Sequence, residues 1–425
     1  MPASPSAAAA HSDASNDATA TATAETAQRP PRPGATRLHH LDALRGGALL
    51  LGIVLHTVLG FVPDSSWLFQ DTRTVAWGEA VVVVIHLFRM VLFMMLAGYF
   101  GRMVLRRRGT GSYVKDRMLR IGLPLLAFWP LAVLSLPIVI VIGSQLRGTE
   151  LPTDPRTEGQ TPGLLQVFAP GQLWFLLLLL EIILVTLAVG AILRRLLGAG
   201  RAEAISRRIG AALAAPAGLA LAAIPYALGL LTQGTNTGGI MEPITILPVP
   251  GASIAYAGAF AVGWFLHASP GSLDRVAAAW PVKLGLAVAL TVGSLLLTGT
   301  EGRMLAVVAV AGTALAGWAW VYALIGITAR FLNREIVVVR YLADASYWIY
   351  LLHLPLVVAL GLTLADLPAP APLKLIVNLV LTTGILLLTY DLFVRSTWIG
   401  GWLNGHRRPR ALLRTRVRRG ETRRA

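Results

Sequence analysis

The 425-residue chain contains no cysteine. Disulfide bridges, thiolate metal sites and cysteine nucleophiles are therefore excluded from its chemistry. Charged residues are also scarce: they make up 14% of the chain, whereas 55% of the residues are hydrophobic. Together with a mean hydropathy of +0.65, this composition excludes an ordinary soluble domain and indicates a polytopic membrane protein.

Acidic residues are fewer than basic ones, 21 against 37, which gives a formal net charge of +16. In a soluble protein this excess would suggest nucleic-acid binding. In a membrane protein, basic residues beside the spans account for it more simply, so no nucleic-acid partner is expected.

About ten apolar segments are each long enough to cross the hydrocarbon core of a bilayer. The sequence therefore predicts an all-α, polytopic membrane protein. The predicted spans lie near residues 41–61, 80–100, 121–142, 173–193, 211–231, 252–267, 282–299, 304–329, 342–364 and 373–394.

The distribution of Lys and Arg predicts the orientation of these spans. If the N-terminus is cytoplasmic, the cytoplasmic segments hold 31 of these residues and the outer segments only 5, which places both termini inside. Residues 1–36 are predicted to be a disordered cytoplasmic leader, because they lack the apolar core of a signal peptide. Residues 37–394 form the membrane domain, and 395–425 a basic cytoplasmic tail suited to anionic lipids.

Two ionisable residues stand out in the first span. Arg45 and His56 are eleven residues apart, so a helix places them roughly 16 Å apart and within about 20° of one face. Ionisable groups inside the bilayer are costly and are commonly functional. Their register suggests a path with an anion held at the inner mouth and a proton-transfer group deeper inside.

Four further ionisable residues are predicted to share the depth of His56. They are His86, Arg89, Glu181 and His353, and with His56 they would line a buried polar chamber. Each also has a structural interpretation, since a membrane histidine can simply bond a neighbouring helix. For Arg89, a structural ion pair with Glu181 and a substrate-binding role both remain open.

The inner face carries Arg117 and Arg120, one turn apart in the segment RMVLRRRGTGSYVKDRMLR. They can serve membrane topology alone, or they can bind phosphates, for which planar guanidinium groups are well suited. Two long outer segments, 143–172 and 232–251, are either recognition loops or spacers.

These residues carry a resemblance to the acyltransferase 3 family of bacterial membrane proteins. The segments RLHHLDALRGGALLLGIVLHTVLGFV, VIHLFRMVLFMMLAGYFGRMVLRRRG, LWFLLLLLEI and SYWIYLLHLPLVV resemble the glucan-biosynthesis succinyltransferase branch. The family motif, an arginine and a histidine separated by ten residues, is present as Arg45 and His56. An Arg-x-x-Arg (Arg117, Arg120) and a SYxxYLLH element ending at His353 accompany them.

The resemblance implies acyl transfer from cytoplasmic acyl-coenzyme A to a carbohydrate hydroxyl outside a bacterial cytoplasmic membrane. It also implies that His56 is the catalytic histidine. On this interpretation Arg45, Arg117 and Arg120 hold the phosphates of coenzyme A, and His56 removes a proton from the acceptor. Arg89 or His86 would stabilise the oxyanion, or Arg89 would bind the free carboxylate of a succinyl group.

No metal is expected in this chemistry. The acyl group, succinyl or acetyl, stays open. The main alternative is a transporter or flippase that moves a glycan or an acylated intermediate without forming a bond.

Overall fold

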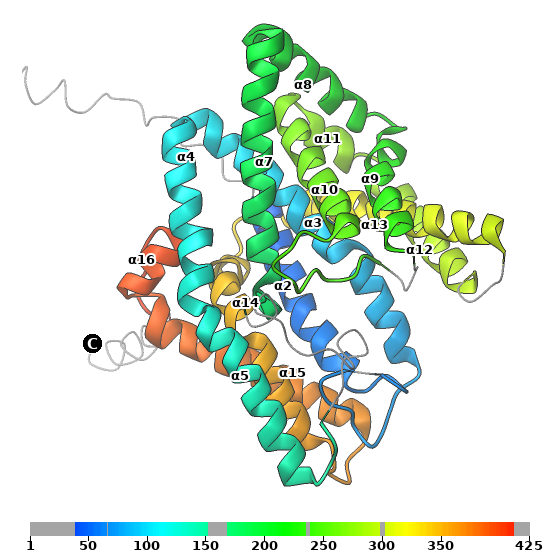
Figure 1. Cartoon of the computed structure of the whole chain (residues 1–425), viewed down its shortest axis with the longest axis vertical. Coiled ribbons are helices and arrows are strands. Elements are labelled where there is room, and N and C mark those ends of the chain that lie inside the picture. The colour runs from blue at the N-terminus through cyan, green and yellow to red at the C-terminus, as the bar shows by residue number, and fades with distance from the viewer. Residues whose placement is uncertain (1–38, 66, 152–167, 235–238, 298–301, 412–425) are drawn as a thin grey trace, which may run out of the picture. The chain divides into compact units, whose positions relative to one another are not determined.

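The computed structural model describes residues 39–65, 67–151, 168–234, 239–297 and 302–411 (Figure 1). The predicted leader, 1–36, lies outside these residues. Within the described part of the chain every regular element is a helix, which confirms the all-α class.

Long helices alternate with short helical segments along the chain. In sequence order they are α2 (His39–Leu59), α3 (Trp77–Arg108), α4 (Thr110–Arg117), η1 (Met118–Gly122), α5 (Leu123–Arg147), η2 (Gly171–Leu173), α7 (Trp174–Leu197), α8 (Ala199–Leu213), α9 (Gly218–Gln233), α10 (Pro250–Ala268), α11 (Ser272–Ala277), α12 (Trp280–Leu296), α13 (Arg303–Phe331), α14 (Val337–Leu364), α15 (Ala371–Thr389), η3 (Tyr390–Val394) and α16 (Trp398–Asn404).

Seven of the described helices or continuous helical stretches are long and apolar enough to cross a membrane, which confirms a multi-pass protein. The pair α8 and α9 passes the same test only jointly, although it bends by 99° at its break, and α12 is shorter. The predicted span 211–231 is therefore wrong in its boundaries. α8 ends at Leu213 at the bend, and α9 starts only at Gly218. A total of ten crossings stays a prediction.

Small residues let the central helices approach closely. Gly98 of α3 lies against the backbone oxygen of Phe260, and Gly263 of α10 lies against that of Met95. A side chain at either glycine would collide with the facing backbone. This reciprocal contact fixes α3 against α10, and the two helices lie side by side in Figure 1.

Helices α2 and α14 pack side by side and run in the same direction. Near their starts Arg45 Nη2 donates to the carbonyl of Ala343 at 3.3 Å. Eleven residues further along α2, the ring of His56 contacts the ring of His353 of α14. Arg45 and His56 thus both face the same neighbouring helix, as their predicted register requires.

The connection between α2 and α3 is anchored at several points. Phe69 is held between Gly60 and Gly361. The backbone N–H of Asp71 donates to the carbonyl of Gly60 at 2.8 Å. The Asp71 carboxylate pairs with Lys374 at 2.9 and 3.0 Å, and both residues are buried. Breaking a buried ion pair of this kind strongly destabilises the folded protein.

Segments far apart in sequence meet at both ends of α14. At the predicted inner end, Trp402 donates to the carbonyl of Leu119 at 2.7 Å, and Arg408 pairs with Asp344 at 3.2 Å. The described start of the basic tail is therefore folded against the ends of the spans. At the other end, Arg147 pairs with Asp366.

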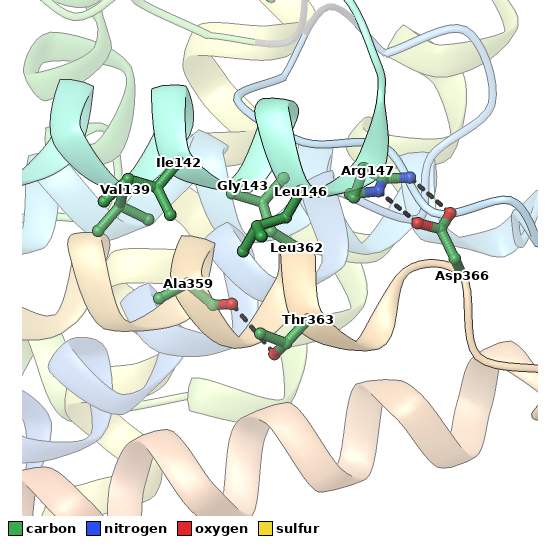
Figure 2. A pocket seen from close by; sticks show the side chains of 9 residues that line it. All are labelled: Val139, Ile142, Gly143, Leu146, Arg147, Ala359, Leu362, Thr363 and Asp366. Carbon is green, nitrogen blue, oxygen red and sulfur yellow. Dashed lines mark hydrogen bonds and ion pairs between the residues drawn. The ribbon is translucent and has the colours of Figure 1, made fainter.

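A groove of about 370 Å³ lies between α5 and α14 (Figure 2). Its walls are mainly aliphatic, and the forked pair between Arg147 and Asp366, at 2.7 and 2.8 Å, lies at one end. None of the predicted site residues lines this groove. It is an apolar depression of the helical surface rather than a place for polar chemistry.

Candidate active site

The candidate site is centred on His56, near the end of α2. Its imidazole stacks on the indole of Trp67, with ring centres 5.3 Å apart and an interplanar angle of 11°. On another side lies the ring of His353, at 5.2 Å. The Nδ1 atom of His56 is buried and has no hydrogen-bond partner among the described residues. It is placed to exchange a proton with a polar ligand.

The tautomer of His353 follows from its contacts. Its Nδ1 lies 2.9 Å from the carbonyl oxygen of Tyr350 and 3.2 Å from that of Ile349. Because a carbonyl only accepts, Nδ1 must carry the proton. In neutral His353 the other ring nitrogen, Nε2, is then an acceptor.

The side chain of Arg89 extends from α3 to the region of His56, because it passes α2 at a glycine. A Cβ atom at Gly52 would lie 2.6 Å from Arg89 Nη1. Gly52 is one turn before His56, so this glycine makes room for the guanidinium group immediately beside the histidine. Arg89 is buried, and its Nε has no partner within the described part of the chain.

His86, one turn before Arg89, faces a carboxylate that the sequence analysis did not single out. Its Nε2 lies 3.2 Å from Oε1 of Glu242, which belongs to the connection between α9 and α10. Burial alone would raise the pKa of Glu242, but the electrostatic effect of the neighbouring imidazole of His86 outweighs it and lowers the pKa to about 2. Glu242 is therefore an anion among basic groups, and its charge also acts on His56 and Arg89.

The loop of Glu242 is fixed by side chains of α9. The hydroxyl of Tyr226 accepts from the backbone N–H of Ile240 at 3.3 Å, and Gln233 accepts from that of Met241 at 2.9 Å. Ile240 is completely buried. This loop is part of the predicted outer segment 232–251, and its residues Gly239, Ile240 and Pro243 are buried against the helices.

Glu181 does not take its predicted place beside Arg89. Its side chain on α7 lines a small separate pocket with Trp174 and Pro243, and no ion pair joins it to Arg89 among the described residues. Depth along a span can be estimated from sequence, but the direction in which a side chain leaves its helix depends on packing. His56, His86, Arg89 and His353 are brought together, and Glu242 supplies the acid instead.

The predicted phosphate-binding residues lie away from the histidines, at the other end of α2. Arg45 is partly exposed and lies 3.7 Å from Asp42. Arg117 and Arg120 both pair with Asp116, at 3.3 and 3.0 Å. Within the described chain no group of three metal-ligating side chains is assembled.

Trp67, Gln172 and Glu242 were not predicted from sequence. Trp67 and Glu242 lie in connections between helices, where no helical periodicity marks a buried residue, and Gln172 lies in η2, directly before α7. The one signal was length, because Gln172 and Glu242 belong to the two long segments 143–172 and 232–251, and long loops at one face commonly carry function.

Comparisons with known proteins indicate the family of the chain. A family profile described as an acyltransferase domain matches residues 38–391. Glucans biosynthesis protein C of Salmonella paratyphi A is 27% identical over 376 residues, which cover 85% of this chain and 93% of that protein. The proteins of the same name from Salmonella typhi and Salmonella typhimurium show the same identity and coverage. No solved structure matches the chain significantly.

Proposed function

Since the chain belongs to the acyltransferase family whose profile covers residues 38–391, we propose that it moves an acyl group from acyl-coenzyme A to a carbohydrate hydroxyl. The similarity to glucans biosynthesis protein C supports a glucan as the acceptor. We place the enzyme in a bacterial cytoplasmic membrane, with the donor inside and the acceptor outside. The acyl group is succinyl or acetyl.

One observation carries the proposal: the buried, orphaned Nδ1 of His56 near the buried side chain of Arg89. In the reaction His56 takes the proton of the acceptor hydroxyl while the hydroxyl oxygen attacks the thioester carbon. The carbon–sulfur bond of the resulting intermediate then breaks. The proton passes from His56 to the departing thiolate, which gives free coenzyme A and a carbohydrate ester.

Arg89 is the group best placed to stabilise the negative oxygen of this intermediate. A preorganised donor in a buried site costs no reorganisation during the reaction. With a succinyl donor, the same guanidinium group can bind the free carboxylate instead. Glu242 offsets the positive charge of Arg89 and of a protonated His56.

Donor binding is assigned to Arg45, Arg117 and Arg120. Guanidinium groups bind phosphates with two parallel hydrogen bonds. Arg45 faces α14 at one end of α2, and His56 faces it further along. The thioester arm of coenzyme A is long and weakly charged, so it can follow α2 from the arginines to the histidine.

The test is a thiol-release assay on the purified full chain. With acyl-coenzyme A and a glucan oligosaccharide, an enzyme liberates free coenzyme A in proportion to ester formed. A transporter or flippase binds or moves its cargo without releasing thiol. Absence of acceptor-dependent thiol release with both succinyl and acetyl donors would contradict the proposal.

A further inference from the structure

We propose that Trp67 and Gln172 form a subsite for the acceptor sugar, one on each side of His56. The inference rests on the proposed function and names the residues that recognise its acceptor. The ligand class is an uncharged, polyhydroxylated sugar unit, whose hydroxyls both donate and accept hydrogen bonds.

The two residues are the ends of one continuous row of side chains. Trp67 stacks on His56 at 5.3 Å, and His56 contacts His353 at 5.2 Å. The ring of His353 lies 6.4 Å from that of Tyr350, whose hydroxyl donates to the backbone carbonyl of Gln172 at 3.0 Å. The row is thus a strip of polar groups in which the proposed base is the neighbour of Trp67, and Gln172 joins the other end through its backbone carbonyl.

Both ends of the row carry buried polar atoms without partners. In the described part of the chain, Trp67 Nε1 is such a donor, and both Oε1 and Nε2 of Gln172 are orphaned. Buried polar side-chain atoms are nearly always hydrogen-bonded, so each orphan calls for a partner. The indole offers a donor, and the amide offers donors and an acceptor. This combination matches the hydroxyls of a sugar.

Both residues are held by anchored backbone, which preorganises the subsite. The loop of Trp67 is tied down by the buried pair of Asp71 and Lys374. The approach to Gln172 is fixed by Trp129 of α5, which donates to the carbonyl of Ala169 at 3.0 Å. Ordering a flexible subsite on binding would reduce the affinity for the ligand. The anchored backbone avoids that cost.

The position of Trp67 also separates acceptor from donor. Trp67 lies in the α2–α3 connection, whereas the predicted donor arginines lie near the start of α2 and before α5. Gln172 lies deeper, because Tyr350, which donates to its carbonyl, is one turn from Tyr347, which donates to the carbonyl of Arg120. Arg147, at the far end of α5, donates to the carbonyl of Gln70 in the same connection as Trp67. Acceptor and donor would then approach His56 from opposite ends of the spans.

The experiment compares Gln172→Leu and Trp67→Phe with the wild-type chain, using acyl-coenzyme A and a glucan oligosaccharide. Loss of one hydrogen bond to the sugar should raise the KM for the oligosaccharide about tenfold. The KM for acyl-coenzyme A should stay unchanged in both variants. Trp77→Phe and Gln145→Leu, at exposed positions of α3 and α5, are the matched controls.

An unchanged KM for the oligosaccharide in both variants would overturn the subsite. So would a fall in kcat with no change in KM. If Gln172→Leu fails to assemble, Gln172→Glu keeps the shape and removes the amide donors, and it should raise the same KM. Wild-type turnover decides the proposed function separately, because a chain that is not an acyltransferase releases no thiol before any variant is compared.

Discussion

Replacing Gly52 with alanine tests the arrangement of the active site without removing any of its charges. The new Cβ atom would lie 2.6 Å from Arg89 Nη1. Non-bonded heavy atoms prefer a separation of about 3.5–4.0 Å, so the guanidinium group must move by about 1 Å. A misplacement of that size can lower the rate about 10²-fold when it disturbs a catalytic geometry.

The same substitution should leave the fold intact. Arg89 Nη1 is the end of a flexible side chain, which can shift more easily than backbone. Alanine is also favoured over glycine in a helix interior by roughly 1 kcal/mol. Gly52→Ala is therefore expected to melt at or above the wild-type temperature while losing most of its activity.

Gly47→Ala is the matched control on the same helix, because nothing lies within 4 Å of a Cβ at Gly47. Both variants gain the same helix propensity, and only one displaces Arg89. The assay is kcat/KM for coenzyme A release, measured with a melting curve for each purified protein. Equal activity of the two variants would refute the claim that the position of Arg89 matters.

Four other substitutions test single elements of the account. His56→Ala should reduce turnover by about 10²- to 10⁴-fold in a folded, membrane-inserted protein, and substantial residual turnover would place the base elsewhere. Arg89→Gln should impair succinyl transfer far more than acetyl transfer, and equal losses would remove its proposed carboxylate-binding role. Glu242→Gln removes the negative charge that offsets Arg89 and a protonated His56. It should lower kcat about tenfold or more, since a loss of about 1.4 kcal/mol corresponds to a factor of ten. Glu79→Gln, at an exposed site, should leave kcat unchanged. Lys374→Met leaves a buried carboxylate unpaired and should cost about 3–5 kcal/mol of unfolding free energy; an unchanged melting temperature would contradict that buried pair.

The corrected boundary at α8 and α9 shows where sequence reasoning about spans is weak. Apolar composition continues from residue 211 to 231, so the sequence predicts one span there, although Pro216 and Pro225 interrupt it. The structure bends by 99° between the two helices. A sliding measure of hydropathy counts apolar residues but carries no information about the direction of the chain.

The sequence alone determined the helical class and predicted that His56, His86, Arg89 and His353 share one depth. These properties are local: they depend on runs of apolar residues and on rise per residue along a helix. Only the tertiary structure decided that Glu181 turns away and that Trp67, Gln172 and Glu242 complete the site. Those side chains are placed by loop anchors and by the contact of helices distant in sequence, which no single segment encodes.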